Sequence, residues 1–132
     1  MVNLAAKTIL IVDDQQFVRT IVRSMLAQMG VTSVLEASNG EDALRSVSEY
    51  HPHAVICDIQ MRPTDGFTFV RKLREDQTTA KLPVIMLTAH ADSATVSRGA
   101  GLDIDAFVSK PVLPTSLGQT LTQVLERREK SA

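Results

Sequence analysis

Five residues with chemically useful side chains stand at the ends of apolar runs. Asp13 and Asp14 follow one run, Asp58 ends another, and Thr88 and Lys110 end or follow two more. Neighbouring carboxylates at the end of a buried strand repel one another and lose hydration, so a compensating charge is needed. Mg²⁺ suits this role because it prefers oxygen ligands. A hydroxyl and an ammonium group bind phosphoryl oxygens, and a carboxylate can accept the phosphorus, so these residues predict Mg²⁺-dependent phosphoryl transfer onto Asp58.

The apolar runs predict five buried strands. Most runs are continuously apolar and do not alternate, which is typical of strands that helices cover on both faces. The expected strands span residues 8–12, 33–37, 54–58, 83–88 and 104–109.

Segments of helical periodicity separate these runs. We expect helices over residues 15–29, 40–50 and 91–98, one around residues 67–73, and one that begins at Pro114 and precedes a charged tail. The helix over residues 91–98 is expected to be short and mobile because its Ser, Thr and Asp residues favour turns and caps. In the first helix, seven residues at helical spacing predict a single apolar face: Phe17, Val18, Ile21, Val22, Met25, Leu26 and Met29.

The alternation of strands and helices predicts an α/β fold. We expect a doubly wound, five-stranded parallel sheet of the flavodoxin-like type, with strand order 2-1-3-4-5. Ligands of such sheets bind beyond the carboxyl ends of the strands, where the strand order reverses. This order makes the first and third strands neighbours, so Asp13 and Asp14 should meet Asp58 there.

Length, charge and cysteine content narrow the function classes. A chain of 132 residues with 44% apolar content is expected to form a single domain over residues 1–132. Its net charge of −1 argues against nucleic-acid or anionic-membrane partners, and it has neither a bilayer-spanning apolar run nor a signal peptide. We therefore expect a cytoplasmic protein, in which the single cysteine, Cys57, is a core residue.

Five short motifs resemble a known family in their order and spacing. They are "VDD" at 12–14, "CDIQM" at 57–61, "DG" at 65–66, "LTA" at 87–89 and "FVSKP" at 107–111. Together they resemble the receiver domain of two-component response regulators, particularly the stand-alone chemotaxis type, over about residues 8–128.

The resemblance implies a phosphorylation site and its metal. Asp58 would accept phosphate from a phosphohistidine of a sensor histidine kinase or a histidine phosphotransfer protein. Asp14, Asp58 and the backbone carbonyl of Gln60 would bind Mg²⁺. Asp13 would bind the ion through water or orient its ligands.

The resemblance also implies a switch. Thr88 and Lys110 would hold phosphoryl oxygens, and a movement of Thr88 would admit the aromatic residue Phe107 to the space it leaves. Gln60 and His90 would modulate the lifetime of the acyl phosphate. The bond from Lys110 to Pro111 is expected to be cis.

Two features depart from the family pattern or compete with it. The family usually has proline four residues after the phosphoacceptor, where this chain has Arg62 before Pro63. His51 and His53 could suggest a second metal site, but no further ligand clusters with them, which disfavours this interpretation.

Several functions compete on this fold. The main expectation is a phosphorylation-operated switch that is not a turnover enzyme and acts through protein contact or phosphate relay on an unidentified target. The alternative is a phosphorylation-independent interaction module. Flavin binding is disfavoured because "DDQQ" would repel the cofactor's phosphate, and a haloacid-dehalogenase-like phosphatase would need an aspartate at Gln60.

Overall fold

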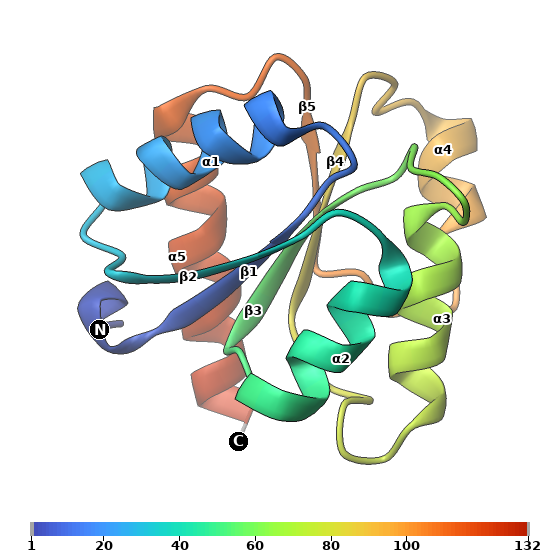
Figure 1. Cartoon of the computed structure of the whole chain (residues 1–132), viewed down its shortest axis with the longest axis horizontal. Coiled ribbons are helices and arrows are strands. Elements are labelled where there is room, and N and C mark those ends of the chain that lie inside the picture. Colours follow the sequence, from blue (N-terminus) through green and yellow to red (C-terminus); the bar gives the residue numbers. More distant parts are fainter. Residues whose placement is uncertain (1, 132) are drawn as a thin grey trace.

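The computed structural model describes residues 2–131, in which five strands alternate with five α-helices (Figure 1). The strands are β1 (Thr8–Val12), β2 (Ser33–Ala37), β3 (Ala54–Asp58), β4 (Val84–Thr88) and β5 (Ala106–Ser109). The helices are α1 (Gln16–Gln28), α2 (Gly40–Tyr50), α3 (Gly66–Glu75), α4 (Ser93–Arg98) and α5 (Pro114–Ser131), and a short 3₁₀ helix, η1 (Leu4–Ala6), precedes β1.

The strands form one parallel sheet in the order β2-β1-β3-β4-β5, which confirms the predicted fold class and strand order. The direction of winding reverses at β1, which pairs with both β2 and β3. The carboxyl ends of β1 and β3 therefore lie side by side at the place where doubly wound sheets bind their ligands.

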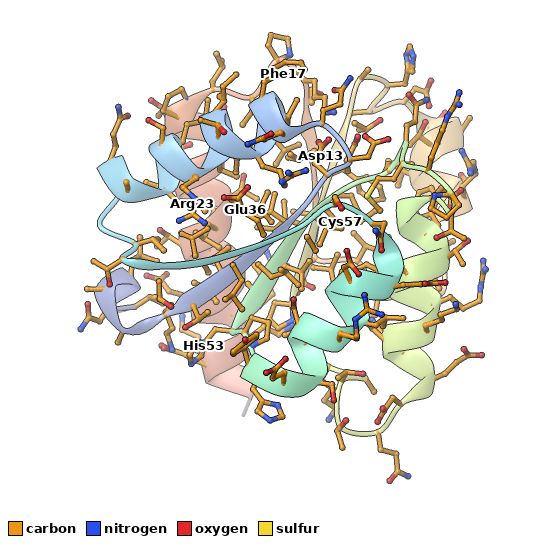
Figure 2. All side chains as sticks on the ribbon, in the orientation of Figure 1. Asp13, Phe17, Arg23, Glu36, His53 and Cys57 are labelled. Atoms are coloured by element: carbon orange, nitrogen blue, oxygen red, sulfur yellow. The ribbon has the colours of Figure 1, made fainter. Side chains whose placement is uncertain are left out.

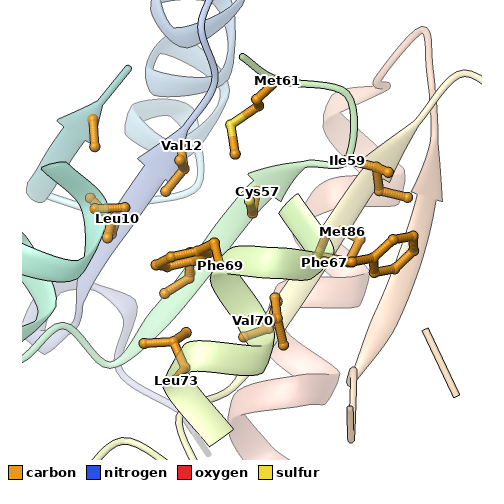
Figure 3. Close-up of a cluster of buried hydrophobic side chains, with 14 of the residues drawn as sticks. Leu10, Val12, Cys57, Ile59, Met61, Phe67, Phe69, Val70, Leu73 and Met86 are labelled. Carbon is orange, nitrogen blue, oxygen red and sulfur yellow. The ribbon is translucent and has the colours of Figure 1, made fainter. Parts of the chain in front are cut away.

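Helices cover both faces of the sheet, with α1 and α5 on one face and α2, α3 and α4 on the other (Figure 1). Alternate residues of each strand enter opposite layers because strand side chains point alternately to the two faces. Ile9 and Ile11 pack with α1 and α5, whereas Leu10 and Val12 pack with α2 and α3. Figure 3 shows the cluster that contains Leu10 and Val12, in which Phe69, Val70 and Leu73 of α3 lie against the sheet. Two buried apolar layers therefore enclose the sheet.

Side-chain caps fix where three of the helices begin. Asn39, Asp65 and Asp92 each accept a hydrogen bond from a backbone N–H in the first turn of α2, α3 and α4. Such caps satisfy donors that have no partner within the helix. Gly30, with φ of 98°, follows the end of α1 in the left-handed region that glycine tolerates.

The predicted element bounds were close to the observed ones. β1, β2 and β3 have the predicted ends, whereas β4 and β5 start at Val84 and Ala106, later than the predicted residues 83 and 104. The fourth helix is short, as predicted. The charged tail is helical, because α5 continues to Ser131.

The predicted apolar face of α1 is buried only in part. Val22 and Leu26 are buried, but Phe17 is 63% exposed and Ile21 is 49% exposed. Helical spacing shows which residues share a face, and it does not show how far the neighbouring layer extends beneath them. An apolar strip is therefore exposed near the start of α1.

Among the described residues, no helix combines the length and the apolar character needed to cross a membrane.

Candidate functional site

Three aspartates meet at the carboxyl edge of the sheet, as the strand order predicted. Asp13 and Asp14 follow β1, Asp58 ends β3, and one carboxylate oxygen from each lies within 4.8 Å of the other two. Asp13 and Asp58 are buried, at 1% and 5% exposure, whereas Asp14 is exposed. The convergence places three negative charges in one small, partly desolvated site.

Asp13 has one buried oxygen that makes no hydrogen bond, although Lys110 Nζ lies 3.8 Å from it. Its backbone N–H donates to the Ala37 carbonyl at 3.1 Å, and its Oδ1 accepts from the Gln15 N–H at 2.9 Å. Its Oδ2 is buried and accepts no hydrogen bond (Figure 2 labels Asp13). Burial, together with the charges of Asp58 and Asp14, raises the pKa of Asp13 despite the Gln15 N–H and Lys110. A bare buried carboxylate oxygen costs free energy unless a cation approaches it.

This donor set fits a hard divalent cation. Carboxylate oxygens from Asp13, Asp14 and Asp58 are the ligands that Mg²⁺ prefers, and the Oδ2 of Asp13 is buried without a hydrogen bond. Gln60, whose carbonyl was predicted as a further ligand, lies exposed two residues after Asp58.

Lys110 brings a positive charge to the aspartates. Its Nζ lies 3.1 Å from Asp58 Oδ1 and 3.8 Å from Asp13 Oδ2, and its side chain is 25% exposed. The Lys110 backbone N–H donates to the Thr88 carbonyl at 2.8 Å, which fixes the start of the loop after β5. The bond from Lys110 to Pro111 is cis, as expected. This ammonium group can therefore contact both Asp58 and an oxygen atom of a group attached to it.

Thr88 ends β4, the strand beside β3, and its side chain is at the same edge of the sheet. It is 5% exposed, and its Oγ1 accepts a hydrogen bond from the His90 backbone N–H at 2.9 Å. Accepting this bond leaves the hydroxyl proton free to donate. Thr88 thus keeps a donor for an anion. His90 itself is exposed, two residues further along the chain.

Phe107 links β5 to the end of α4. It is half-buried and packs against the cluster of α2 and α3. A Cβ built on Gly99 would lie 3.1 Å from Phe107 Cζ and 3.0 Å from Phe67 Cε1, closer than ordinary packing allows. The absence of a side chain at Gly99 therefore lets the end of α4 approach both rings.

The loop after β3 folds back onto Asp58. The Gly66 N–H donates to the Ile59 carbonyl at 2.7 Å, and a Cβ on Gly66 would collide with the Asp58 carbonyl oxygen. The bond from Arg62 to Pro63 in this loop is cis, at the position where the sequence departs from the family pattern.

Three residues that the sequence singled out, one cysteine and two histidines, do not contribute side chains to the acidic cluster. Cys57 is fully buried, and burial raises the pKa of its thiol well above the ordinary value, which fits the predicted core role. His53 Nδ1 accepts the Thr8 N–H at 3.0 Å at the opposite edge of the sheet. His51 lies at the end of α2 with φ of 49°, so neither histidine joins the acidic cluster.

Arg19 contacts the site and was missed by the sequence analysis. Its Nη1 donates to the Asp13 carbonyl oxygen at 2.6 Å. In the sequence, an arginine on a polar helix turn predicts a solvated charge. The contact with Asp13 could not be predicted, because it depends on how α1 packs on the sheet.

Comparisons with known proteins agree with this geometry. Residues 9–122 match the family model of the response regulator receiver domain. The chain is 36% identical over 125 residues to response regulator Rre1 of Synechocystis sp., covering 95% of this chain and 54% of that protein. It spans about half the length of the curated relatives it matches.

Solved structures show the same fold. A putative response regulator from Chloroflexus aurantiacus superposes with a TM-score of 0.85 at 32% identity, covering 91% of this chain and 98% of that one. The chemotaxis protein CheY4 of Vibrio cholerae gives a TM-score of 0.84 at 28% identity, covering 89% and 98%. By its sequence match and its fold, the chain belongs to the family of response regulator receiver domains.

Proposed function

We propose that this receiver domain is a signalling switch operated by phosphorylation of Asp58. The observation that carries the proposal is the Lys110 Nζ at 3.1 Å from Asp58 Oδ1, within a cluster of three carboxylates. A carboxylate beside an ammonium group and a cation site can accept a phosphoryl group because the added negative charge is neutralised locally.

The proposed reaction conserves its atoms and charges. A carboxylate oxygen of Asp58 forms a bond to phosphorus while the nitrogen–phosphorus bond of a phosphohistidine breaks. The imidazole leaves with the electron pair of that bond and takes up a proton, and Asp58 becomes an acyl phosphate. Lys110 and Thr88 then donate hydrogen bonds to phosphoryl oxygens.

Mg²⁺ is the proposed cofactor, in keeping with a family whose members bind this ion at an acidic site. Asp13, Asp14, Asp58 and the Gln60 carbonyl would hold it. When bound, it supplies positive charge that offsets the charge building up during transfer.

Thr88 and Phe107 are the proposed switch. A phosphoryl oxygen would accept a hydrogen bond from the Thr88 hydroxyl and draw the side chain toward Asp58, and Phe107 would occupy the space that Thr88 leaves. Because Phe107 packs against Gly99, its movement would change the surface formed by α4, β5 and α5. Coupling free energies of such two-state devices are about 1 to 3 kcal/mol.

A protein is the proposed phosphodonor, either a sensor histidine kinase or a histidine phosphotransfer protein. The exposed side chains of Phe17 and Ile21 support this, because exposed apolar patches of this kind mark protein contacts. Ile21 also lines a cavity of about 290 Å³ that Lys110 connects to the acidic site; its other lining residues are Val18, Val22, Pro111 and Val112. A helix of the donor could bind there with its histidine directed at Asp58.

The proposal also covers output and location. Output would pass through protein contact or phosphate relay in the cytoplasm, without direct contact between this domain and nucleic acid. The balance of 14 basic and 15 acidic residues supports the last point.

Incubation with acetyl phosphate and Mg²⁺ tests the proposal. We expect one acid-labile phosphate per chain, located on Asp58 by mass spectrometry and absent in Asp58→Asn or with excess chelator. A stable phosphorylated fraction without continuous consumption of acetyl phosphate would support a phosphoacceptor over a turnover enzyme.

Two other results would contradict it. No labelling at any Mg²⁺ concentration would favour the phosphorylation-independent interaction module, and rapid continuous hydrolysis would favour an enzyme. Asp42→Asn, in the first turn of α2 and outside the acidic cluster, is the control for loss of an acidic residue elsewhere.

A further inference from the structure

An ion-pair network joins α1 to the edge strand β2 next to the acidic site. Glu36 of β2 accepts hydrogen bonds from two arginines of α1, with Arg19 Nε at 3.0 Å from Oε1 and Arg23 Nε at 2.7 Å from Oε2. Figure 2 shows Arg23 and Glu36 together between these two elements. The side chains of Arg19, Glu36 and Arg23 are 14%, 28% and 47% exposed, so Arg19 is the most enclosed of the three.

Arg19 alone of the two arginines reaches the site. Its Nη1 donates to the Asp13 carbonyl at 2.6 Å, whereas the further contact of Arg23 is a long one, 3.4 Å to the Val34 carbonyl. The Asp13 N–H and Oδ1 are already bonded to Ala37 and Gln15. With Arg19 bonded to the carbonyl, Oδ2 is the one polar atom of Asp13 that makes no hydrogen bond.

The contact also fixes Asp14. The Asp13 carbonyl belongs to the peptide plane that joins Asp13 to Asp14, so holding this oxygen sets the direction in which the chain enters Asp14. Three carboxylates within 4.8 Å repel one another, and a loop free to move would let them separate. Arg19 opposes that movement by holding the Asp13 carbonyl oxygen.

Only arginine has the geometry for this double contact. Its planar guanidinium places Nε on Glu36 and Nη1 on the Asp13 carbonyl at the same time. The two ion pairs also act on Glu36. Burial works to raise its pKa, but the hydrogen bonds from Arg23 and Arg19 outweigh burial and lower it, so the carboxylate stays charged.

Two effects of Arg19 on cation binding oppose each other. Its positive charge repels a cation, so loss of the charge would strengthen binding. Its hydrogen bond to the Asp13 carbonyl keeps the carboxylates in place, so loss of this hydrogen bond would weaken cation binding. Glu36 neutralises much of the charge at 3.0 Å and solvent screens the rest, so we expect the positional effect to be larger.

We propose that Arg19, held by Glu36, is a positioning residue that preorganises Asp13 and Asp14 for binding of a divalent cation. The inference rests on the proposed function, because it assumes that the three aspartates bind Mg²⁺. Residues outside the ligand shell that hold metal ligands typically change affinity by about tenfold or more when they are replaced.

The test measures the Mg²⁺ dissociation constant by titration calorimetry at fixed ionic strength. Arg19→Met removes both the charge and the contact with the Asp13 carbonyl. Arg19→Lys keeps the charge but cannot bind Glu36 and the Asp13 carbonyl at the same time. Arg23→Met is the matched control, because it removes the same charge and an ion pair to the same Glu36 without touching Asp13. We expect the dissociation constant to rise about tenfold in both Arg19 variants and to stay within about twofold in Arg23→Met.

Unfolding by urea in the presence of chelator separates positioning from general stability. If Arg19 serves only to join α1 to β2, Arg19→Met and Arg23→Met will lower stability and Mg²⁺ affinity alike, which overturns the inference. Tighter binding by Arg19→Met with normal binding by Arg19→Lys also overturns it, because the charge would then decide. If Arg19→Met does not fold, the Mg²⁺ dissociation constants of Arg19→Lys and Arg23→Met are compared instead, and equal values overturn the inference.

Failure of the proposed function gives a different pattern. If the unaltered chain does not bind Mg²⁺, the proposed function and this inference both fall. If the unaltered chain binds Mg²⁺ and both Arg19 variants bind it equally well, only the inference falls.

Discussion

Buried charged groups differ between the carboxyl ends of the strands (the carboxyl edge) and their amino ends (the amino edge) in how completely they are hydrogen-bonded. At the carboxyl edge, Asp13 Oδ2 is buried without a hydrogen bond, beside the carboxylates of Asp14 and Asp58. At the amino edge, Asp105 is equally enclosed, with its side chain 4% exposed, but both oxygens are bonded. Arg128 donates to them at 2.8 and 3.0 Å, and the Val84 N–H donates to Oδ1 at 2.9 Å.

Arg74 adds to the contrast at the amino edge. Its guanidinium donates to four carbonyl oxygens at 2.8–3.1 Å, and so joins the loop after α3 to the loop before β5: Ala80, Leu82, Leu102 and Asp103. Buried charges that are fully bonded stabilise a particular arrangement, whereas unbonded ones cost stability. The fully bonded charges at the amino edge therefore stabilise the fold, whereas the carboxylates at the carboxyl edge cost stability at the site that we propose binds Mg²⁺.

Loss of the Arg74 contacts should have the largest effect. We expect Arg74→Met to lower the free energy of unfolding by about 3 kcal/mol, because four carbonyls lose a charged donor while the apolar stem is retained. Urea unfolding measures it. Arg71→Met, on the exposed face of the same helix, is the control and should change stability by about 0.5 kcal/mol or less.

The same variant tests whether the two edges are independent of each other. Its Mg²⁺ affinity in the folded state should match that of the unaltered chain, because Arg74 contacts no residue of the acidic cluster. An equal loss of affinity and stability would show that the two edges are not independent.

Removal of a charge at the carboxyl edge should have the opposite sign. We expect Asp13→Asn to raise the free energy of unfolding by about 1 to 2 kcal/mol in the presence of chelator. The variant removes a desolvated charge beside two carboxylates, and its amide can donate to them, while Oδ1 still accepts from Gln15. This gain should exceed the loss of the attraction to Lys110 at 3.8 Å.

Saturating Mg²⁺ should reverse the order of the two proteins. A ligand stabilises the folded state that binds it, so the unaltered chain gains stability with Mg²⁺ and Asp13→Asn does not. Thermal unfolding with and without the ion measures both effects. A loss of stability in chelator on replacing Asp13 would refute the idea that this edge is strained by its charges.

Most of the fold and of the acidic cluster could be predicted from the sequence. The strands are short apolar runs because they are buried on both faces, so their bounds were clear for β1, β2 and β3. Asp13, Asp14 and Asp58 could be predicted to meet because carboxyl ends of neighbouring parallel strands share one edge.

Long charged side chains could not be placed in this way. Arg19, Arg74 and Arg128 lie on helix surfaces, where a sequence pattern predicts solvated charges, and their partners are set by how the helices pack. Arg128 was predicted to be part of a charged tail, but it lies within α5 and binds Asp105. The exposure of Phe17 escaped prediction for a related reason, since it depends on where the neighbouring layer ends.

The smallest predicted effect concerns His53, which binds β1 to the chain before β3 at the amino edge. Its Nδ1 accepts the Thr8 N–H at 3.0 Å, so the ring must be neutral on that nitrogen. Burial and then the charge of Lys7 lower the pKa of His53 from its ordinary value of 6.5. The unfolded chain therefore takes up the proton first, and stability is present above pH 6.5 and is lost as the pH falls through the lowered pKa.

His53→Asn tests this link, because the amide oxygen can accept the same N–H and does not titrate. Between about pH 7.5 and about pH 5, we expect the unaltered chain to lose more unfolding free energy than the variant, by less than about 1 kcal/mol because the ring is solvent-exposed. Urea unfolding at the two pH values measures the difference. If acidification lowers the unfolding free energy of both proteins equally, the hydrogen bond from Thr8 to the His53 ring does not couple protonation to folding.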